Sequence, residues 1–565
     1  MFEISLFAFL LSYFFFMWPT ILRQLAAMQD ADYFYEKYIV FMKAQRKVES
    51  MWVMVGFIGA NLLLQRMFTL PIYLLIHAAA LTVLGLLHLR KPKEKKPRMD
   101  KRLTGVCIAA AALLLAIFLG IGMLFSGTFF WEMPFILSFL GFMTDTWILL
   151  GNWILSPFVK RAEKRSAKAA SERIAAVNQA RAEAGKSPLT VVGVAGSYGK
   201  SGLISAAEAL LSGERTVLAT NEAKLGSVGN AGECVIKGLT AEHDAVLMEI
   251  MARHPGDVKA FTNAIPVNAG VLTSAAERNL ETFLSPERLT ETLMELADSL
   301  TPQGEKAALA VNYDDERLRK QKAESVRFVR YGSYKGDVLP QHLDLYAKNL
   351  TATLDGTSFA LCTRDGREQA VNTPLLGTLA AEAAIGAAAL ALELGVPNDK
   401  VSAKLNTLQP LPGYVSLLPG GAWPERIRKR LAKPWETDGE LTREKARWRF
   451  LDSMDALSIE GARDSLNLLA GFTGFRVLLT AGMYGQGAKE DETNRLLGRS
   501  AAKCADAIVV VGKAKFPLIE DGAQRAGFAM GDLHLAANLQ DAMARISAMA
   551  ADESGKTCVL SLGAF

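Results

Sequence analysis

Cysteine and histidine are scarce in this chain of 565 residues. The five cysteines lie far apart and form no Cys-x-x-Cys spacing: Cys107, Cys234, Cys362, Cys504 and Cys558. This argues against a disulfide scaffold and a zinc ribbon, and it is typical of reduced thiols in a protein that faces the cytosol. The six histidines form no metal-binding cluster with cysteine and no Ser-His-Asp order, so neither a zinc site nor a triad hydrolase is indicated.

Excess charge of one sign is also small. There are 63 Lys and Arg against 58 Asp and Glu, a formal net charge of +5, and the sequence shows no nucleic-acid-binding motif. We therefore expect no nucleic-acid partner. Half of the residues are hydrophobic and the mean hydropathy is +0.17, which excludes disorder as the main state and directs attention to membrane segments.

Long apolar segments crowd the first 160 residues. A helix needs roughly 20 residues to cross a bilayer, and every predicted span except the second, which is short, reaches that length. The five predicted spans are Phe2–Leu22, Met51–Leu64, Met67–Leu89, Leu103–Phe125 and Phe130–Phe158. The first lacks the basic start and Ala-x-Ala end of a signal peptide, so we expect it to be retained.

Loop charge predicts the orientation of this module. Five spans place the basic stretches 23–50, 90–102 and 159–168 on one side, as the positive-inside rule requires. We therefore expect residues 1–158 to form a multi-pass module in the cytoplasmic (inner) membrane, with everything that follows in the cytoplasm. Residues 159–188 are expected to form a solvated basic linker helix, either touching anionic membrane lipids or serving only as a linker.

A phosphate-binding loop opens the remaining sequence. The β-branched run 189–194 precedes Gly196-Ser197-Tyr198-Gly199-Lys200-Ser201, and a helical pattern follows. Glycines allow backbone N–H groups to approach phosphates, Lys200 can reach the terminal phosphates and Ser201 can hold Mg²⁺. The pattern predicts nucleotide binding, with a structural glycine turn as the alternative.

Strands and helices alternate after this loop. The run 243–250 is a predicted strand that ends near Glu249, where parallel sheets place ligand groups, and further strands are expected at 268–274 and 307–312. A helix is expected at 287–300. This order predicts an α/β fold with a mainly parallel sheet and helices on both faces.

The order of motifs resembles the Mur ligase family, and the D-alanyl-D-alanine-adding type in particular. The family's G-x-x-G-K-[ST], Thr-led loop, Glu with H-P-G-[ED], N-x-G-E-A-H-L-E-x-F and N-x-D-D motifs have counterparts here. The corresponding segments are Gly196–Ser201, Thr220–Glu222, Glu249 with His254–Asp257, Ser274–Phe283 and Asn312–Asp315. Further along, 452–458 is similar to the family's D-S-Y-N-A-N-P and 482–487 to its G-x-M-x-E-L-G.

The resemblance implies a domain plan. We expect a phosphate-loop, ATP-binding central domain at 189–413 and a Rossmann-like C-terminal ligase domain at 414–565, with predicted strands at 475–482 and 505–512. The membrane module would then stand where the family has its N-terminal UDP-binding domain.

The resemblance also implies cofactors and site residues. ATP and Mg²⁺ are the implied cofactors; the implied catalytic residues are Lys200, Glu249 and Asn279, and the metal ligands are Ser201 and Glu249. Asn312 and Asp315 join the phosphate loop as nucleotide-binding residues. His254, Asp452 and Ser453 are implied at the substrate. From the residues alone, His254 could instead cap a helix, the aspartates at 314–315 could end a strand, and the pair 452–453 could be an N-cap.

Several positions depart from the family pattern. Asn279 stands for a histidine, Leu293 for a lysine that is often carbamylated, Leu379 and Ala380 for a His-Asn pair, and Tyr414 for the arginine of P-G-R. The segment 434–449 is expected to be a charged surface insertion.

These observations lead to one main hypothesis and two alternatives. The main one is a membrane-anchored ATP-dependent amide ligase that forms an acyl phosphate and joins an amino acid or short peptide to a cell-envelope precursor or polymer, either lipid-linked or not. The alternatives are a polyglutamate-synthase-like ligase and a degenerate nucleotide-binding scaffold with protein partners in envelope synthesis.

Overall fold

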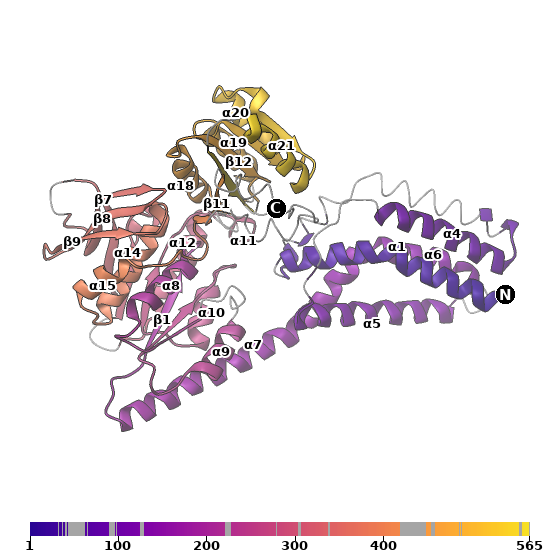
Figure 1. Ribbon diagram of the computed structural model, residues 1–565. Coiled ribbons are helices and arrows are strands. Elements are labelled where there is room, and N and C mark those ends of the chain that lie inside the picture. The colour runs from indigo at the N-terminus through magenta and orange to yellow at the C-terminus, as the bar shows by residue number, and fades with distance from the viewer. Residues whose placement is uncertain are drawn as a thin grey trace. The chain divides into compact units, whose positions relative to one another are not determined.

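The computed structural model comprises two compact units, Met1–Ala162 and Glu163–Phe565 (Figure 1). The structure describes residues 1–31, 33–36, 38–39, 42, 63–64, 66–89, 97, 99–124, 129–220, 228–277, 280–302, 307–336, 340–418, 448–453, 458–484, 486, 489–552 and 556–563. Each unit is considered by itself.

The first unit is helical. Its elements are α1 (Phe2–Asp30), α4 (Leu70–Leu89), α5 (Lys101–Leu124), α6 (Phe129–Phe142) and the first part of α7 (Thr144–Glu183). Within the described residues, two helices are long and apolar enough to cross a bilayer, Phe2–Gln29 and Lys101–Leu124. The bent pair α6 and α7 would add a third, and the apolar helix Leu70–Leu86 is shorter.

The structure corrects one predicted span and leaves another untested. Most of the predicted second span, residues 51–62, lies outside the described residues. The predicted fifth span is not one straight helix, because it breaks at Met143 with a bend of 69°. The Asp145 carboxylate accepts a hydrogen bond from the backbone N–H of Thr146 at 2.7 Å, a local contact that competes with helix continuation. The five-span topology stays a prediction.

The end of α7 belongs to the second unit and is not fully solvated. Ala167, Ala170, Ile174 and Val177 are buried in one core with α9 (Val228–Gly238) and β1 (Thr190–Ala195). The Arg181 side chain is buried and donates to the carbonyl of His243 at 2.6 Å. The expectation of a solvated helix is therefore wrong for this face, whose small residues allow close packing.

A nine-stranded sheet forms the larger part of the second unit. Its order is β2-β3-β1-β4-β5-β6-β7-β8-β9, parallel from β2 to β7 and antiparallel from β7 to β9. The strands after β1 are β2 (Val217–Ala219), β3 (Ala245–Glu249), β4 (Ala269–Leu272), β5 (Ala307–Asn312), β6 (Val326–Tyr334), β7 (Leu345–Thr353), β8 (Gly356–Thr363) and β9 (Glu368–Thr373).

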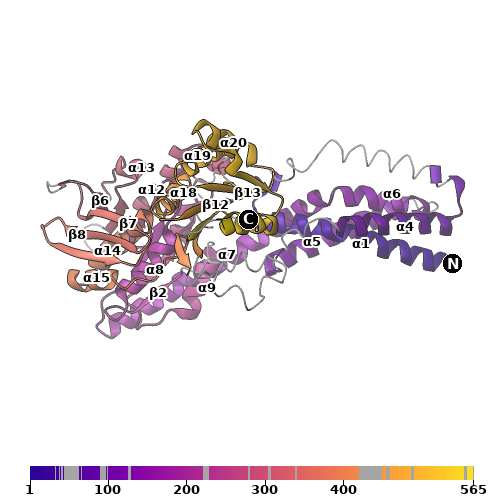
Figure 2. The ribbon, with the colours of Figure 1, turned by 45° about the horizontal axis from the view of Figure 1, so that its top comes forward.

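Helices cover both faces of this sheet. Val192 and Val194 face α8 (Lys200–Leu211) and α14 (Thr378–Glu393), whereas Val191 and Ala195 face the opposite core. The remaining helices are α10 (Asp257–Ala264), α11 (Leu280–Phe283), α12 (Pro286–Ser299), α13 (Glu316–Arg319) and α15 (Asn398–Leu405). Figures 1 and 2 both show α8 and α14 as neighbours. We call this part the nine-stranded lobe.

A second sheet has the order β10-β11-β15-β12-β13-β14, parallel except for the β10–β11 pair. Its strands are β10 (Ser416–Leu418), β11 (Trp448–Ser453), β12 (Phe475–Thr480), β13 (Ala507–Val511), β14 (Leu533–Ala536) and β15 (Thr557–Leu562). Its helices are α18 (Ile459–Ala470), α19 (Glu490–Ala501), α20 (Phe516–Arg525) and α21 (Leu539–Asp552), with the short η3 (Met530–Asp532). We call this part the six-stranded lobe.

The predicted fold class is confirmed: a helical N-terminal module precedes α/β domains with mainly parallel sheets. The predicted insertion at 434–449 lies outside the described residues except for Trp448 and Arg449, which begin β11.

Candidate functional site

The phosphate loop follows the central strand at a change of chain direction across the sheet. From β1 the chain continues to β2 on one side and later returns to β4 on the other. Ligands of open α/β sheets bind outside the carboxyl ends of the strands at such a point. The loop therefore occupies the expected position for a ligand site.

Gly196 brings the loop against the next strand. Its φ is +151°, and a Cβ at this position would lie 2.0 Å from Thr273 Oγ1 and 3.0 Å from the backbone nitrogen of Ser274. Only glycine fits this approach without displacement of the backbone. The glycine at the start of the motif is thus required by packing as well as by its predicted ligand.

Lys200, Ser201 and Glu249 form a polar cluster at the start of α8. Ser201 Oγ donates to Glu249 Oε2 at 2.9 Å, and Lys200 Nζ lies 3.9 Å from Glu249 Oε1. Lys200 Nζ also donates to the Gly196 carbonyl at 2.8 Å. Lys200 and Glu249 are 5% and 8% exposed, so a buried cation and a buried anion neutralise each other here.

Strand register explains why Glu249 reaches this cluster. Glu249 ends β3 and pairs with Val194 of the neighbouring β1, two residues before the loop. Thr220, after β2, accepts from the Glu249 N–H at 3.2 Å through Oγ1 and fixes the backbone there. Thr220 is the described part of the predicted Thr-led loop; positions 221–222 lie outside the described residues.

The other half of the loop is tied to the segment after β4. The Ser197 N–H and hydroxyl both donate to the Ser274 carbonyl, at 2.8 and 3.0 Å. Thr273 Oγ1 donates to the carbonyl of Tyr198 at 2.5 Å. The structure therefore gives Ser197 a contact that fixes the loop, and Thr273 is a site residue that sequence reasoning missed.

Asn312, Asp314 and Asp315 follow β5 at the same sheet edge. Asn312 Nδ2 donates to the Thr273 carbonyl at 3.0 Å, and the Asp314 carboxylate accepts from Ser333 N–H at 2.7 Å. Asp315 caps α13 and also accepts from Ala275 N–H at 2.6 Å. The structural alternative for the two aspartates thus has direct support, while their role toward a nucleotide stays a prediction.

Carboxyl groups crowd the adjoining start of α14. Burial, together with the nearby Asp314 carboxylate, raises the pKa of Glu382 to about 8, and a hydrogen bond from Asn312 opposes the shift. Burial likewise raises the pKa of Asp314 and of Asp464.

Tyr414 stands where the resembled family has arginine, and it contacts the phosphate loop. A Cβ on Gly199 would lie 2.7 Å from the Tyr414 hydroxyl, and one on Gly202 would lie 2.4 Å from its ring. Burial raises the pKa of Tyr414 well above its usual value, so the hydroxyl is neutral. Sequence reasoning recorded Tyr414 only as a departure, because no local pattern shows that it packs on the loop.

The predicted substrate residues lie in two different settings. His254 precedes α10, where its N–H donates to Asp257 Oδ2 at 2.7 Å, so its backbone takes part in a turn at the helix start. Asp452 and Ser453 end β11, and Ser453 Oγ lies 2.6 Å from Ser465 Oγ. The N-cap alternative for this pair is wrong, because Ser458 caps α18 through the Gly461 N–H.

Asn279 and Leu293 are two of the departures from the family pattern. Asn279, predicted as catalytic, lies outside the described residues. Leu293 lies on α12 and is fully buried in the core that this helix covers. A leucine packed in that core offers no ligand atom, so the lysine of the resembled pattern has no functional replacement at Leu293.

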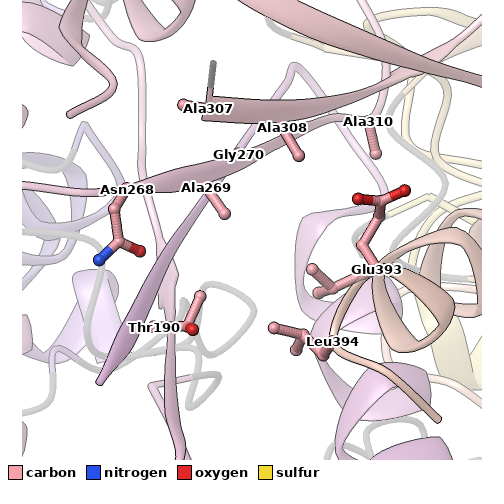
Figure 3. A pocket seen from close by; sticks show the side chains of 10 residues that line it. Thr190, Asn268, Ala269, Gly270, Ala307, Ala308, Ala310, Glu393 and Leu394 are labelled. Atoms are coloured by element: carbon pink, nitrogen blue, oxygen red, sulfur yellow. The ribbon is translucent and has the colours of Figure 1, made fainter. Parts of the chain in front are cut away.

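The cavity shown in Figure 3 lies away from this cluster. It has a volume of about 180 Å³ and is lined by residues at the amino ends of strands, including Thr190 and Ala307, and by Glu393 and Leu394 at the end of α14. Lys200 lies beyond the carboxyl end of β1. The cavity therefore lies toward the amino ends of the strands, whereas the Lys200 cluster lies at their carboxyl ends.

Comparisons with known proteins show a similarity to one family of ligases. Residues 194–391 match the Mur ligase middle domain. The UDP-N-acetylmuramoyl-tripeptide–D-alanyl-D-alanine ligase of Escherichia coli K12 is 26% identical over 330 residues, 58% of this chain and 65% of the relative. The enzyme of the same name from Mycobacterium tuberculosis H37Rv is 28% identical over 227 residues, 40% of this chain and 42% of the relative. The chain thus spans less than two thirds of either relative.

Solved structures show the same fold. MurF from Acinetobacter baumannii has a TM-score of 0.55 at 18% identity, covering 71% of this chain and 77% of that one. MurF ligase from Thermotoga maritima in complex with ADP has a TM-score of 0.51 at 19% identity, covering 69% and 80%. Residues 194–391 therefore form a Mur ligase middle domain, and the chain is similar to MurF-type ligases in sequence and in fold.

Proposed function

We propose that the chain is an ATP-dependent amide ligase that joins an amino acid or short peptide to a carboxylate of a cell-envelope precursor. The observation that carries the proposal is the cluster of Lys200, Ser201 and Glu249 on a phosphate loop within a Mur ligase middle domain. The similarity to UDP-N-acetylmuramoyl-tripeptide–D-alanyl-D-alanine ligases supports the ligase class.

The residues present fit ATP and Mg²⁺. The hydroxyl of Ser201 and the carboxylate of Glu249 are hard oxygen donors, which Mg²⁺ prefers, and they already lie within hydrogen-bond distance of each other. The first backbone N–H groups of α8 have no partner within the helix and favour an anion. The ADP in the Thermotoga maritima MurF structure supports an adenine nucleotide.

The proposed reaction has two steps. A substrate carboxylate oxygen attacks the γ-phosphorus of ATP and ADP leaves; the amine nitrogen then attacks the acyl phosphate, loses a proton and displaces inorganic phosphate. Mg²⁺, when bound, would neutralise phosphate charge. Lys200 would place its positive charge against the terminal phosphates once it leaves Gly196, and Ser201 and Glu249 would hold the metal ion.

Substrate recognition is assigned to residues around this edge. His254, Asp452 and Ser453 remain the proposed substrate residues, Asn279 the proposed third catalytic residue, and Asn312 and Asp315 the proposed nucleotide-binding residues. Asp452 lies at the carboxyl end of β11, which is the end where parallel sheets present ligand groups. The negative charge of the Asp452 carboxylate would favour the positive charge of the incoming amine.

The helical module supports membrane attachment at the cytoplasmic face. Its two long apolar helices could each cross a bilayer, and the basic stretches 90–102 and 159–168 favour a cytoplasmic position for the ligase lobes. An acceptor at the inner leaflet, including a lipid-linked one, would then be close to the site. A reporter fused after residue 127 should be periplasmic and one after residue 95 cytoplasmic; the reverse pattern would contradict the five-span topology.

A second candidate function is a nucleotide-binding scaffold for envelope assembly. The buried Leu293 and the apolar Leu379 and Ala380 favour it, because they replace polar groups of the resembled enzymes. A scaffold would bind nucleotide without turnover and would act through protein partners.

One experiment separates the candidates. The full chain in nanodiscs is incubated with MgATP and a panel of amino acids, dipeptides and envelope acceptors, and ADP and phosphate are measured. Release that requires both an amine and an acceptor, and that is lost in Lys200→Ala, supports the ligase. Nucleotide binding without release under every pairing would favour the scaffold.

A further inference from the structure

The first turn of α14 is capped by a carboxylate from the other lobe. Asp464 Oδ1 accepts from the Thr378 N–H at 2.9 Å and from the Thr378 hydroxyl at 2.8 Å, and Oδ2 accepts from the Leu379 N–H at 3.3 Å. Asp464 belongs to α18 of the six-stranded lobe and is 9% exposed. The contact is therefore a buried, three-donor hydrogen-bond set between the two lobes.

The start of α14 lacks a cap of its own. The N-cap residue is Gly377, which has no side chain to accept a hydrogen bond from the first turn. The N-terminus of a helix leaves N–H groups without partners and favours negative charge. Asp464 supplies the acceptor that a local Ser, Thr, Asp or Asn would otherwise provide.

Gly377 is also shaped for this particular partner. Its φ is +90°, and a Cβ on it would lie 2.2 Å from Asp464 Oδ2. Any other residue at 377 would push the carboxylate away. The glycine and the aspartate thus form a matched pair across the lobe interface.

This pair lies beside the phosphate loop. α14 packs along α8 in one core, and a Cβ on Gly386 would lie 2.8 Å from Leu203. Tyr414, in the segment that leads into β10, packs on Gly199 and Gly202. The contact at Asp464 therefore ties the six-stranded lobe to the helix that packs along α8, which begins at the phosphate loop.

A second bridge between the lobes is more exposed. Glu277 Oε1 accepts from Arg317 at 2.7 Å and from Lys489 of the six-stranded lobe at 2.8 Å, with side chains between 25% and 49% exposed. Ion pairs in contact with solvent contribute little to stability. This pair is therefore a useful reporter of lobe approach rather than its main cause.

We propose that Asp464 is a positioning residue that docks the six-stranded lobe onto the first turn of α14. All donors and acceptors in the contact belong to the chain itself. One consequence rests on the proposed function: docking would hold Asp452 and Ser453 within reach of an acyl phosphate formed at Lys200.

The structural arm of the test uses hydrogen exchange on the purified full chain. Asp464→Ala should speed exchange in a peptide covering 378–382 by about tenfold or more, because hydrogen bonds to a charged group are lost. Asp464→Asn, which keeps a carbonyl acceptor, should fall between. The matched control is Asp541→Ala, which removes an acceptor for Ala537 N–H at the start of α21 within one lobe.

A further readout, carbodiimide coupling, and a further variant, Gly377→Ala, distinguish docking from a purely local cap. A carbodiimide should couple Glu277 to Lys489 in the wild type, and the yield should fall severalfold in Asp464→Ala although neither coupled residue is changed. Gly377→Ala should reproduce both effects, and the double variant should add little to either single one. The Gly377→Ala variant also keeps the proposal testable if Asp464→Ala does not fold.

The kinetic arm separates this inference from the proposed function. If the ligase is active, Asp464→Ala should lower kcat at least tenfold while the Kd for MgATP changes less than about threefold, since Lys200, Ser201 and Glu249 are untouched. If no ligase activity is found, the exchange and coupling results still decide on docking. Unchanged Glu277–Lys489 coupling in Asp464→Ala would overturn the inference, and faster exchange at 378–382 with unchanged coupling would reduce Asp464 to a local cap of α14.

Discussion

Ser201 Oγ donates to Glu249 Oε2 at 2.9 Å, joining the first turn of α8 to the end of β3. The contact links two segments that are 48 residues apart and places a hydroxyl beside a carboxylate that is 8% exposed. Such a pair is suited to hold one divalent cation at the phosphate loop.

Removal of either oxygen ligand should weaken Mg²⁺-dependent turnover. We expect Ser201→Ala and Glu249→Gln each to lower the rate of ATP consumption about 100-fold, because the first removes an oxygen ligand of the metal ion and the second removes the negative charge of the other ligand. Steady-state ADP release at several Mg²⁺ concentrations measures this. Glu208→Gln is the matched control, since Glu208 is exposed on the same helix; an equal loss in that variant would contradict the assignment.

Gly196→Ala should disrupt the loop through contact as well as backbone conformation. Its Cβ would meet Thr273 Oγ1 at 2.0 Å, and the backbone must also keep a φ of +151°. We expect loss of nucleotide binding and destabilisation of about 1–3 kcal/mol.

Gly213→Ala isolates the conformational part of this effect, because its φ is +76° and no atom lies within 4 Å of the added Cβ. Calorimetric unfolding and nucleotide titration should show a clearly larger loss for Gly196→Ala. Equal losses would argue that the close approach to Thr273 is unimportant.

Glu382 should make the stability of the chain depend on pH. Burial raises its pKa from 4.5 to about 8, so the folded state holds the proton more tightly than the unfolded state. The unfolded state releases the proton first as pH rises, and stability should therefore fall between about pH 4.5 and 8 and level off above.

Glu382→Gln should flatten this part of the profile and raise the unfolding temperature at pH 8 to 9. Thermal unfolding of the full chain from pH 5 to 9 measures the difference. A profile that falls as steeply in Glu382→Gln as in the wild type would assign the dependence to other groups.

Cys558 should resist alkylation in the folded chain. It is fully buried on β15, and burial raises the pKa of its thiol to about 12. We expect iodoacetamide at pH 8 to modify it at least about 100-fold more slowly than in the unfolded chain, because the thiolate is the reactive form. The half-buried Cys234 is an internal control for mass spectrometry; similar rates at the two cysteines would contradict the burial.

Local patterns predicted the strands and helices that carry the phosphate loop. The run 189–194 is β-branched and apolar because β1 is buried on both faces, and 307–312 coincides with β5. The Lys-Ser pair after Gly199 begins α8 as its motif predicts. These features depend on residues close in the sequence, so local sequence patterns are sufficient to predict them.

Contacts between distant segments could not be predicted from local sequence patterns. Thr273, Tyr414 and Asp464 reach the loop or α14 from 75 or more residues away, and none belongs to a motif that marks its partner. The break at Met143 was missed because the apolar run continues across it. The buried face of α7 was missed because alanines are compatible with both an exposed and a packed helix.

Calorimetric titration of MgATP into the full chain in nanodiscs tests the account most directly. Saturable binding should occur near one nucleotide per chain, should be lost in Lys200→Ala, and should persist in Glu208→Gln. Absence of binding, or equal binding by the wild type and Lys200→Ala, would contradict the assignment of Gly196–Ser201 as a nucleotide site.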